Sequence, residues 1–349
     1  FMKGGKTAGG GSSRRRATLR DVCRVAGVSK STISHVLNDK PGVGVETRQR
    51  VREVIRKMGY RPRPAARHLS LARTDTIACV FQDLTPGWLL NIYRGILSKA
   101  AELKYHVVTA LSVWEGDQFE LPTNVLGTAS VDGLLWLDPR ATPELIRRFK
   151  EQQHMPFVVL QGHLDDADIA TVSIENTRGA YLAVRHLLSL GRRRLLLVTG
   201  QEDNVDSREK LLGARQALRE AGVRLAPEYV VNGHHVDDFA IRAVDAFLKA
   251  GHPLPDAIFA FNDNMALAVM RWLRERGIRV PEQVAVVGFD GIDEARPAGL
   301  STIETPMREM GMMACQTLVD LIHTPPAERK APHLLMGGTL AARESTRRS

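Results

Sequence analysis

Apolar and polar positions between residues 18 and 37 follow the period of an α-helix, and the pattern breaks once, at Gly27. Before the break, the apolar residues share one helical face: Leu19, Val22, Cys23 and Ala26. Thr18 precedes this run, and threonine can cap a helix through its side-chain oxygen. A glycine at position 27 can adopt the left-handed conformation of a turn at little cost. The pattern predicts a short helix that starts after Thr18 and ends at Gly27.

A second short helix is predicted after the turn, with Ser29 as its N-terminal cap. Its buried side is expected to consist of Val28, Ile33, Val36 and Leu37. The exposed side carries residues that can donate hydrogen bonds, none of them acidic: Lys30, Ser31, Thr32, Ser34 and His35. Two helices joined in this way form a helix-turn-helix with a face suited to the major groove of DNA. An ordinary helical hairpin on a surface fits the same pattern, so this stretch alone leaves both interpretations open.

A third amphipathic helix is expected over residues 46–58, after a turn-rich loop. Its apolar residues recur at i, i+3, i+4 and i+7 and form one face that closes a three-helix core: Val51, Val54, Ile55 and Met58. Gly59 is expected to end the helix. We refer to residues 18–61 as the head, and we expect so small a core to be only marginally stable by itself.

Residues 60–73 contain two prolines that set this segment apart from the head. Pro64 is well placed at the first turn of a short helix over residues 65–71. A helix of this length does not persist in water by itself and would order only against a partner. A plain basic linker is the alternative interpretation of the segment.

From Thr76 onward, short apolar runs alternate with amphipathic helices. The expected strands cover 77–82, 106–110, 133–137, 157–161, 195–199, 257–261 and 284–289, and a helix covers 88–103. Such alternation predicts an α/β architecture of parallel sheets with helices on both faces. Roughly 270 residues are many for one doubly wound sheet, so we expect two lobes. Ligands of such folds bind in the crevice at the carboxyl ends of the strands.

The composition is that of a soluble globular protein, with 44% of the 349 residues apolar and 25% charged. No apolar run approaches the roughly 20 residues that span a bilayer. The basic N-terminus lacks the apolar segment of a secretory signal. Three cysteines lie far apart, without metal-ligand spacing: Cys23, Cys79 and Cys315. We therefore expect a reducing, cytoplasmic location.

Charge is distributed unevenly along the chain, whose formal net charge is +9. Residues 1–75 contain 18 Lys and Arg against 5 Asp and Glu, whereas the remaining 274 residues contain 30 basic and 34 acidic residues. A basic head on a mildly acidic body is typical of a protein that binds nucleic acid. Residues 1–17 are expected to be a disordered basic tail that can reach DNA phosphates without sequence preference.

Motifs in a fixed order extend over residues 18–346. They are Thr-Leu-Arg-Asp-Val at 18–22, Ala-Gly-Val-Ser at 26–29, Thr-Ile-Ser-His-Val-Leu-Asn at 32–38, Glu-Thr-Arg-Gln-Arg-Val at 46–51, Gly-Tyr-Arg-Pro at 59–62, Ala-Arg-His-Leu at 66–69, Asn-Asp-Asn-Met-Ala-Leu at 262–267, Val-Pro-Glu-Gln-Val-Ala-Val-Val-Gly-Phe-Asp at 280–290 and Arg-Glu-Ser-Thr at 343–346. With these motifs, the chain resembles the LacI/GalR family of bacterial transcription regulators.

The resemblance implies a small all-α helix-turn-helix head and a two-lobed body like that of periplasmic binding proteins. The expected divisions are the tail at 1–17, the head at 18–61, a hinge helix and linker at 62–75, and an effector-binding and dimerisation body at 76–349. Within the body, the N-lobe is expected at about 76–172 and 304–333, and the C-lobe at about 173–303 and 334–349.

For DNA binding, the resemblance implies that the second helix lies in the major groove, with Lys30, Ser31 and His35 at base edges. Leu69 matches the hinge-helix leucine that is wedged into the minor groove at the centre of the site. Ordering of the hinge helix would thus be coupled to DNA binding. The residues expected to contact DNA are Thr18, Ser29, Lys30, Ser31, Thr32, Ser34, His35, Asn38, Arg67 and Leu69.

For the body, the resemblance implies a pocket for a small polar effector. The residues expected to contact the effector are Trp88, Leu89, Gln161, Arg208, Lys210, His235, Asn262 and Asp290. Asp290 is the strongest of these candidates, with a helix cap or turn residue as the alternative. Trp88 either stacks on a sugar or a base, or packs within the fold or against another subunit.

The family commonly carries an arginine three residues before a glycine, and here that position is Lys210, before Gly213. Arg208 lies two residues earlier, so both cations remain candidates for the clamp. With His235, they favour an anionic ligand such as a sugar acid or a phosphosugar. A neutral sugar or a nucleobase stays open.

We expect no catalytic site, metal or cofactor, because no nucleophile elbow, phosphate loop or pair of catalytic carboxylates stands out. The cluster of His234, His235, Asp237 and Asp238 has the spacing of no standard tetrahedral metal site. The resemblance implies a homodimeric repressor that binds pseudo-palindromic operator DNA, controlled by a sugar or a sugar derivative, with no membrane partner. A solute-binding protein would need a secretory signal and no basic head, and an enzyme on this fold would need a catalytic constellation.

Overall fold

The computed structural model describes residues 17–37, 41–60, 73–82, 87–115, 118–120, 131–138, 141–152, 155–161 and 168–347. The chain divides into two compact units, Phe1–Thr74 and Asp75–Ser349, each with a hydrophobic core of its own. The expected hinge helix at 65–71 lies outside the described residues. Within the described residues, no helix is both long and apolar enough to cross a membrane.

The described part of the head contains the three expected helices, α1 (Leu19–Ala26), α2 (Lys30–Leu37) and α3 (Val45–Met58). The predicted Thr18 cap is confirmed, because its Oγ1 accepts a hydrogen bond from the amide of Asp21 at 3.3 Å. The Asp21 carboxylate in turn accepts one from the amide of Thr18 at 3.0 Å. Gly27 and Gly59 end α1 and α3 with φ of 65° and 59°, as their positions predict.

The head core is small and lies between the predicted apolar faces. Its buried residues are Val22, Ala26, Ile33, Val36 and Val51. The prediction that Leu37 joins them is wrong, because 36% of its surface is exposed. Leu37 is the last residue of α2 and lies beyond the turn of Ile33 and Val36 that meets the core.

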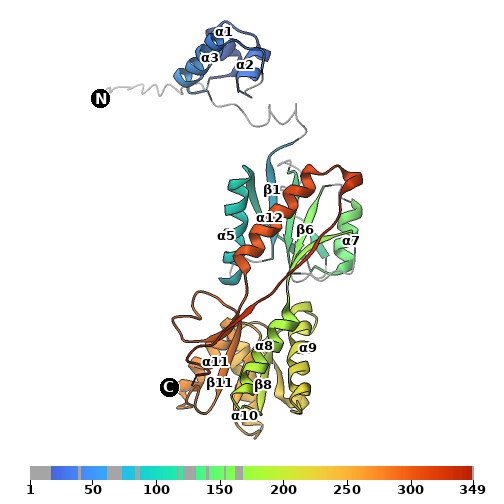
Figure 1. Cartoon of the computed structure of the whole chain (residues 1–349), viewed down its shortest axis with the longest axis vertical. Coiled ribbons are helices and arrows are strands. Elements are labelled where there is room, and N and C mark those ends of the chain that lie inside the picture. Colours follow the sequence, from blue (N-terminus) through green and yellow to red (C-terminus); the bar gives the residue numbers. More distant parts are fainter. Residues whose placement is uncertain are drawn as a thin grey trace, which may run out of the picture. The chain divides into compact units, whose positions relative to one another are not determined.

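The body is built around two six-stranded sheets (Figure 1). The first has the order β13-β7-β6-β5-β1-β2 and is parallel throughout. Its strands are β1 (Thr76–Phe81), β2 (His106–Leu111), β5 (Gly133–Leu137), β6 (Phe157–Leu160), β7 (Ala170–Ile174) and β13 (His333–Met336). With α5 (Gly87–Glu102), α7 (Pro143–Gln152) and α12 (Met307–His323), this sheet forms the N-lobe. A two-stranded hairpin, β3 (Val113–Glu115) and β4 (Gln118–Glu120), follows β2.

The second sheet has the order β14-β12-β11-β10-β8-β9, and β14 alone runs antiparallel to its neighbour. Its strands are β8 (Leu195–Thr199), β9 (Val230–Asn232), β10 (Ala257–Ala260), β11 (Ala285–Asp290), β12 (Ser301–Glu304) and β14 (Thr339–Ala341). With α8 (Asn176–Ser189), α9 (Val205–Glu220), α10 (Asp237–Lys249) and α11 (Asp263–Glu275), it forms the C-lobe. The predicted parallel α/β body with two lobes is therefore confirmed.

The chain passes between the lobes three times: after β7, after β12 and after β13. The last passage falls after Met336, because β13 pairs with β7 of the N-lobe. The second passage leads into α12, which packs against α5 (Figure 1). Gly95 and Gly311 allow this close crossing, since a side chain at either position would collide with the other helix's backbone.

Candidate DNA-binding face and effector pocket

The exposed face of α2 is organised by its N-terminal cap. Ser29 accepts a hydrogen bond from the amide of Thr32 at 3.1 Å, as predicted, and its Oγ lies 2.7 Å from the Oγ of Ser31. Lys30, Ser31 and Ser34 are exposed, and Thr32 and His35 are half-buried. Because Ile33 and Val36 are buried on the opposite side, α2 presents a polar, non-acidic face. Such a face can donate hydrogen bonds to base edges and phosphates.

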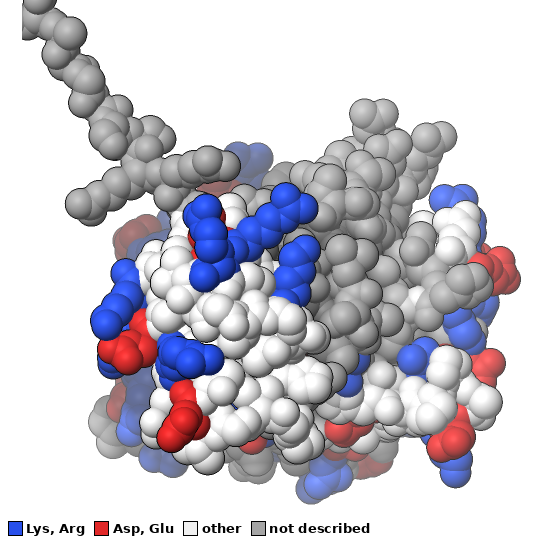
Figure 2. Space-filling model, turned by 90° about the horizontal axis from the view of Figure 1, so that it is seen from above, with Lys and Arg blue, Asp and Glu red and all other residues white. Residues whose placement is uncertain are grey.

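Basic side chains predominate over acidic ones on the part of the head that faces the viewer in Figure 2. The described basic residues of the helices are Arg20, Arg24, Lys30, Arg48, Arg50, Arg52, Arg56 and Lys57, against Asp21, Glu46 and Glu53. This excess favours a polyanionic partner. Asn38, Arg67 and Leu69, also predicted to contact DNA, lie outside the described residues.

In the body, two of the predicted effector residues meet across the lobes. Trp88, at the start of α5, and Asp290, at the end of β11, line one cavity of about 120 Å³. Met307, at the start of α12, also lines it, and Nε2 of Gln161 lies 3.9 Å from its Sδ. Gln161 directly follows β6, and its φ is 54°. The carboxyl end of β11 therefore lines this cavity directly, and Gln161, just after the end of β6, contacts Met307, which also lines it.

Lys210 of α9 lies at the carboxyl ends of the C-lobe strands and is buried, with 5% of its surface exposed. Its Nζ donates a hydrogen bond to the carbonyl oxygen of Phe261 at 3.0 Å, and it lies 4.0 Å from the centre of the Phe289 ring. Phe261 follows β10, and Phe289 is the penultimate residue of β11. Lys210 thus lies buried beside the carboxyl ends of β10 and β11.

The imidazole of His235 lies beside Lys210. Burial, together with the charge of Lys210, lowers the pKa of His235 to about 3, so the ring is neutral at physiological pH. Its Nε2 lies 2.9 Å from the Oγ of Ser207. Gly200 is required at this place, because a side chain there would collide with the ring. Gly200 and Ser207 were not predicted from the sequence.

Asn262 also lies near His235, but its side chain stabilises the local backbone. Its Oδ1 caps α11 by accepting a hydrogen bond from the amide of Met265 at 2.9 Å. Its Nδ2 donates one to the carbonyl oxygen of His235 at 3.3 Å. Asn262 therefore fixes the backbone that carries His235.

Two predicted residues are not brought to the crevice. Leu89 is buried in the hydrophobic core with 2% of its surface exposed. Arg208 is exposed, and its guanidinium donates hydrogen bonds to the carbonyl oxygens of Glu202 and Asp203 at 3.3 and 2.7 Å. Of the two candidates for the cationic position, Lys210 is the one that lies at the carboxyl ends of the C-lobe strands.

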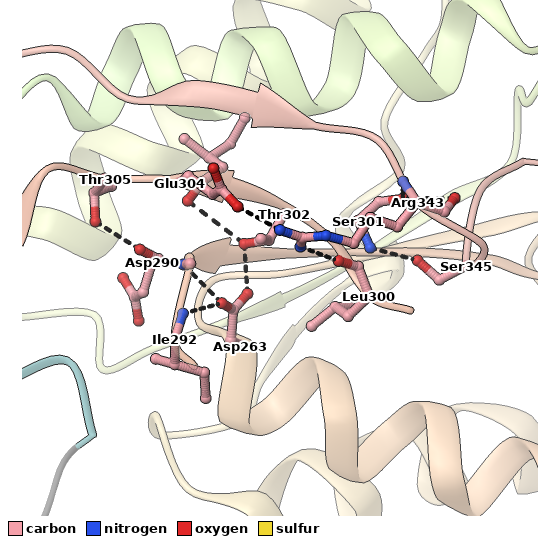
Figure 3. Close-up of polar contacts among 12 residues, drawn as sticks. Asp263, Asp290, Ile292, Leu300, Ser301, Thr302, Glu304, Thr305, Arg343 and Ser345 are labelled. Atoms are coloured by element: carbon pink, nitrogen blue, oxygen red, sulfur yellow. Dashed lines mark hydrogen bonds and ion pairs between the residues drawn. The ribbon is translucent and has the colours of Figure 1, made fainter. Parts of the chain in front are cut away.

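Asp263, the first residue of α11, holds the loop that follows Asp290 (Figure 3). Its carboxylate accepts hydrogen bonds from the amides of Gly291 and Ile292 at 2.7 and 2.9 Å, and from Thr302 Oγ1 at 2.5 Å. Burial raises the pKa of Asp263 to about 7, although these three donors act in the opposite direction. Asp263 thus fixes the backbone that directly follows Asp290.

Asp290 itself has a φ of 117°, in the region that favours glycine. Its carbonyl oxygen accepts hydrogen bonds from the amide and Oγ1 of Thr305 at 3.1 and 2.8 Å. Thr305 belongs to the passage between β12 and α12, so Asp290 is tied directly to an interlobe connection. No dashed line reaches the carboxyl group of Asp290 in Figure 3. Asp290 lines the cavity, and burial raises the pKa of its carboxyl group to about 8.

The Arg-Glu-Ser-Thr motif near the C-terminus contacts β12 at both of its ends, Ser301 and Glu304. Ser345 Oγ accepts a hydrogen bond from the amide of Ser301 at 2.8 Å (Figure 3) and donates one to the carbonyl oxygen of Val286 at 2.6 Å. Arg343 pairs with Glu304 and donates a hydrogen bond to the carbonyl oxygen of Leu300. The motif is structural. Within the described part of the chain, no group of three or more His, Cys, Asp or Glu is placed to hold a metal ion.

Comparison with known proteins matches both units. Residues 18–63 match the family described as bacterial regulatory proteins, lacI family, and residues 184–346 match a periplasmic binding protein-like domain. Catabolite control protein A of Priestia megaterium is 32% identical over 306 residues, which cover 86% of this chain and 91% of that protein. The chain belongs to the LacI family. Another relative, the HTH-type transcriptional repressor PurR of Aliivibrio fischeri, is 29% identical over 317 residues, covering 90% and 94%.

Solved structures of LacI-family regulators have the same fold. The lac repressor dimer bound to operator and the anti-inducer ONPF gives a TM-score of 0.82 at 25% identity and covers 95% of this chain and 99% of its own. The complex of the transcriptional regulator CelR with cellobiose gives 0.69 at 30% identity and covers 95% and 100%. This LacI-family chain is a DNA-binding transcriptional regulator with a small-molecule effector, and members of its family are regulators rather than enzymes.

Proposed function

We propose that this LacI-family regulator is a repressor that acts in the cytoplasm as a homodimer. Each head reads one half of a pseudo-palindromic operator, and an effector in the crevice between the lobes changes the affinity for DNA. The observation that carries this proposal is the face of α2, where Lys30, Ser31 and His35 stand opposite the buried Ile33 and Val36. The hinge residues Arg67 and Leu69 and the contact of Asn38 are part of the same proposal.

Exposed apolar side chains on the body support the homodimer. They are Leu90 and Leu97 on α5, Met313 on α12, and Val236 and Phe239 at the start of α10. Leu90 and Leu97 are seven residues apart and so share one helical face. Apolar side chains exposed on one helical face favour a contact with another protein, and the lac repressor to which the chain is similar is a dimer.

The effector is proposed to be a sugar or a sugar derivative. A pocket with few well-placed polar groups and an aromatic wall suits such a ligand, and the similar CelR binds cellobiose. Trp88, Gln161, Lys210, His235 and Asp290 are proposed as its contacts. Asp290 connects the ligand to Thr305 and hence to the second passage between the lobes.

The test is retardation of a pseudo-palindromic DNA fragment from upstream of the chain's own gene. Affinity should fall steeply as salt rises, because the protein displaces counterions from phosphates. Lys30→Ala should raise the dissociation constant about tenfold to a hundredfold if Lys30 contacts base edges. Lys57→Ala is the matched control, since Lys57 lies on α3 and pairs with Glu53 at 2.9 Å.

No retardation at low salt, with or without sugars, would contradict the repressor proposal. An equal loss of affinity in Lys30→Ala and Lys57→Ala would leave only general electrostatic attraction and would contradict the role of α2.

A further inference from the structure

Lys210 is a buried cation, and burial of a charge lowers the stability of the folded protein unless a partner compensates it. Its ammonium group is buried, and a lysine ammonium has three hydrogen-bond donors. The carbonyl oxygen of Phe261 takes one donor, and the ring of Phe289 faces the group without accepting a conventional hydrogen bond. Among the described residues, no carboxylate forms an ion pair with Lys210. A buried charge without a counterion destabilises the fold, so a compensating partner is expected.

The neighbouring side chains do not supply this partner. His235 is neutral, because burial and the charge of Lys210 lower the pKa of its ring to about 3. Asp290 faces the cavity, and burial raises the pKa of its carboxyl to about 8 even though Lys210 acts to lower it. Among the described residues, therefore, no carboxylate hydrogen-bonds to the ammonium of Lys210, and its acceptor within the protein is the carbonyl oxygen of Phe261.

We infer that the effector carries an anionic group, a carboxylate or a phosphate, and that this group binds the ammonium of Lys210. The inference rests on the proposed effector site and specifies the class of its ligand. Charge-assisted hydrogen bonds to a buried ammonium are short and strong, so a ligand with an anionic group should bind more tightly than one with a neutral hydroxyl. Lys210 is then the residue that selects by charge, while Trp88 and Gln161 contact the uncharged part of the ligand.

The experiment uses the full-length protein and pairs of probes that differ mainly in charge. Glucose is compared with gluconate and with glucose 6-phosphate, and galactose with galacturonate and galactose 6-phosphate, by thermal shift and then by titration calorimetry. We expect anionic members to raise the unfolding temperature more than their neutral partners. The carboxylate and phosphate arms show which source of negative charge the site takes.

Three variants isolate Lys210. Lys210→Met should raise the dissociation constant of the anionic probe about tenfold to a hundredfold, the range for a hydrogen bond to a charged group. Lys210→Arg, which keeps the charge, should stay within a few-fold of the wild-type value. Arg208→Met removes an exposed cation that bonds only to backbone carbonyls, and it should change nothing. Lys210→Met should also unfold at no lower temperature than the wild type, because it removes a buried charge.

Stabilisation by neutral sugars alone, or by no probe, overturns the inference. Neutral sugars that bind and alter operator affinity would leave the proposed function intact, whereas a complete lack of response would contradict both. A lower unfolding temperature of Lys210→Met with an unchanged ratio of anionic to neutral affinity would assign Lys210 a structural role and would also overturn the inference.

Discussion

Asp290 combines three features at the scale of a single residue. Its backbone adopts a φ of 117°, its carbonyl oxygen holds Thr305, and its carboxyl is buried against the cavity. A non-glycine residue in this region of φ costs on the order of 1–3 kcal/mol and persists only where the surroundings fix it. Here Asp263 fixes the next two amides from behind. The strained residue is thus held between the ligand site and the passage to α12.

A pH-dependent stability follows from the same carboxyl. The pKa of Asp290 is raised to about 8, against about 3.9 in an unfolded chain. Between these values the unfolded chain releases a proton that the folded protein retains, so this carboxyl's contribution to stability falls as the pH rises from about 4 to about 8. We expect Asp290→Asn, which cannot ionise, to gain stability relative to the wild type across this window, by up to about 1.4 kcal/mol per pH unit.

Urea unfolding of both proteins at several pH values from about 5 to about 8 measures this difference. His235, whose pKa of about 3 acts with the opposite sign, is present in both proteins and cancels. Asp293→Asn is the matched control, since Asp293 lies three residues further along and its side chain is exposed. A constant difference between Asp290→Asn and wild type over this range would contradict the shifted pKa.

Whether a site residue can be predicted from the sequence depends on the pattern of apolar and polar residues around it. Asp290 could be placed because a polar residue at the end of a buried strand points to the crevice edge. The choice between Arg208 and Lys210 depends on the rotation of α9, where Ser207, Lys210 and Ala214 are buried on one side. That periodicity is visible in the sequence and favours Lys210. The same reasoning assigns Leu89 to the core with Ile92 and Ile96.

The N-terminal cap of α1 shows how a single side chain stabilises a short helix. The first helix has only eight residues, so its caps weigh heavily in its stability. We expect Thr18→Ala to lose the hydrogen bonds to Asp21 and to destabilise α1 by about 1 kcal/mol. Amide hydrogen exchange at Val22 should then become about fivefold faster, while exchange in the body is unchanged. Thr18→Ser keeps the hydroxyl and should restore the protection; an Ala variant with unchanged exchange would mean that the cap is dispensable.

Strands were predictable where burial on both faces gives a continuous apolar run, as in β5 and β8. The sequence analysis did not predict β3, β4, β7, β9 and β13, nor the two strands that show the reason best, β12 and β14. The former begins with Ser301 and Thr302, which are fully buried because Ser345, Thr346 and Asp263 bond to them. A polar strand satisfied by distant residues leaves no periodic signal. The latter has three residues at a sheet edge and is too short to give a pattern.

At the scale of the whole molecule, the regulator consists of two units whose cores differ greatly in size. Among the described residues, the core of the head has five buried residues, whereas the body contains two extensive sheets with helices packed on them. Stability depends on the apolar surface that each core buries, so the units should differ in stability. In a regulator of this kind, DNA should stabilise the head and the effector should stabilise the body.

We therefore expect calorimetry of the full-length protein to resolve a small transition for the head below a larger one for the body. Operator DNA should raise the small transition and a bound effector the large one, since a ligand stabilises the unit that it binds. Val22→Ala truncates a fully buried side chain of the head and should lower only the small transition. Val244→Ala makes the same change in the C-lobe, where the side chain is also fully buried, and should lower only the large transition. A single transition that both variants shift together would contradict this prediction, because it would mean that head and body unfold as one unit.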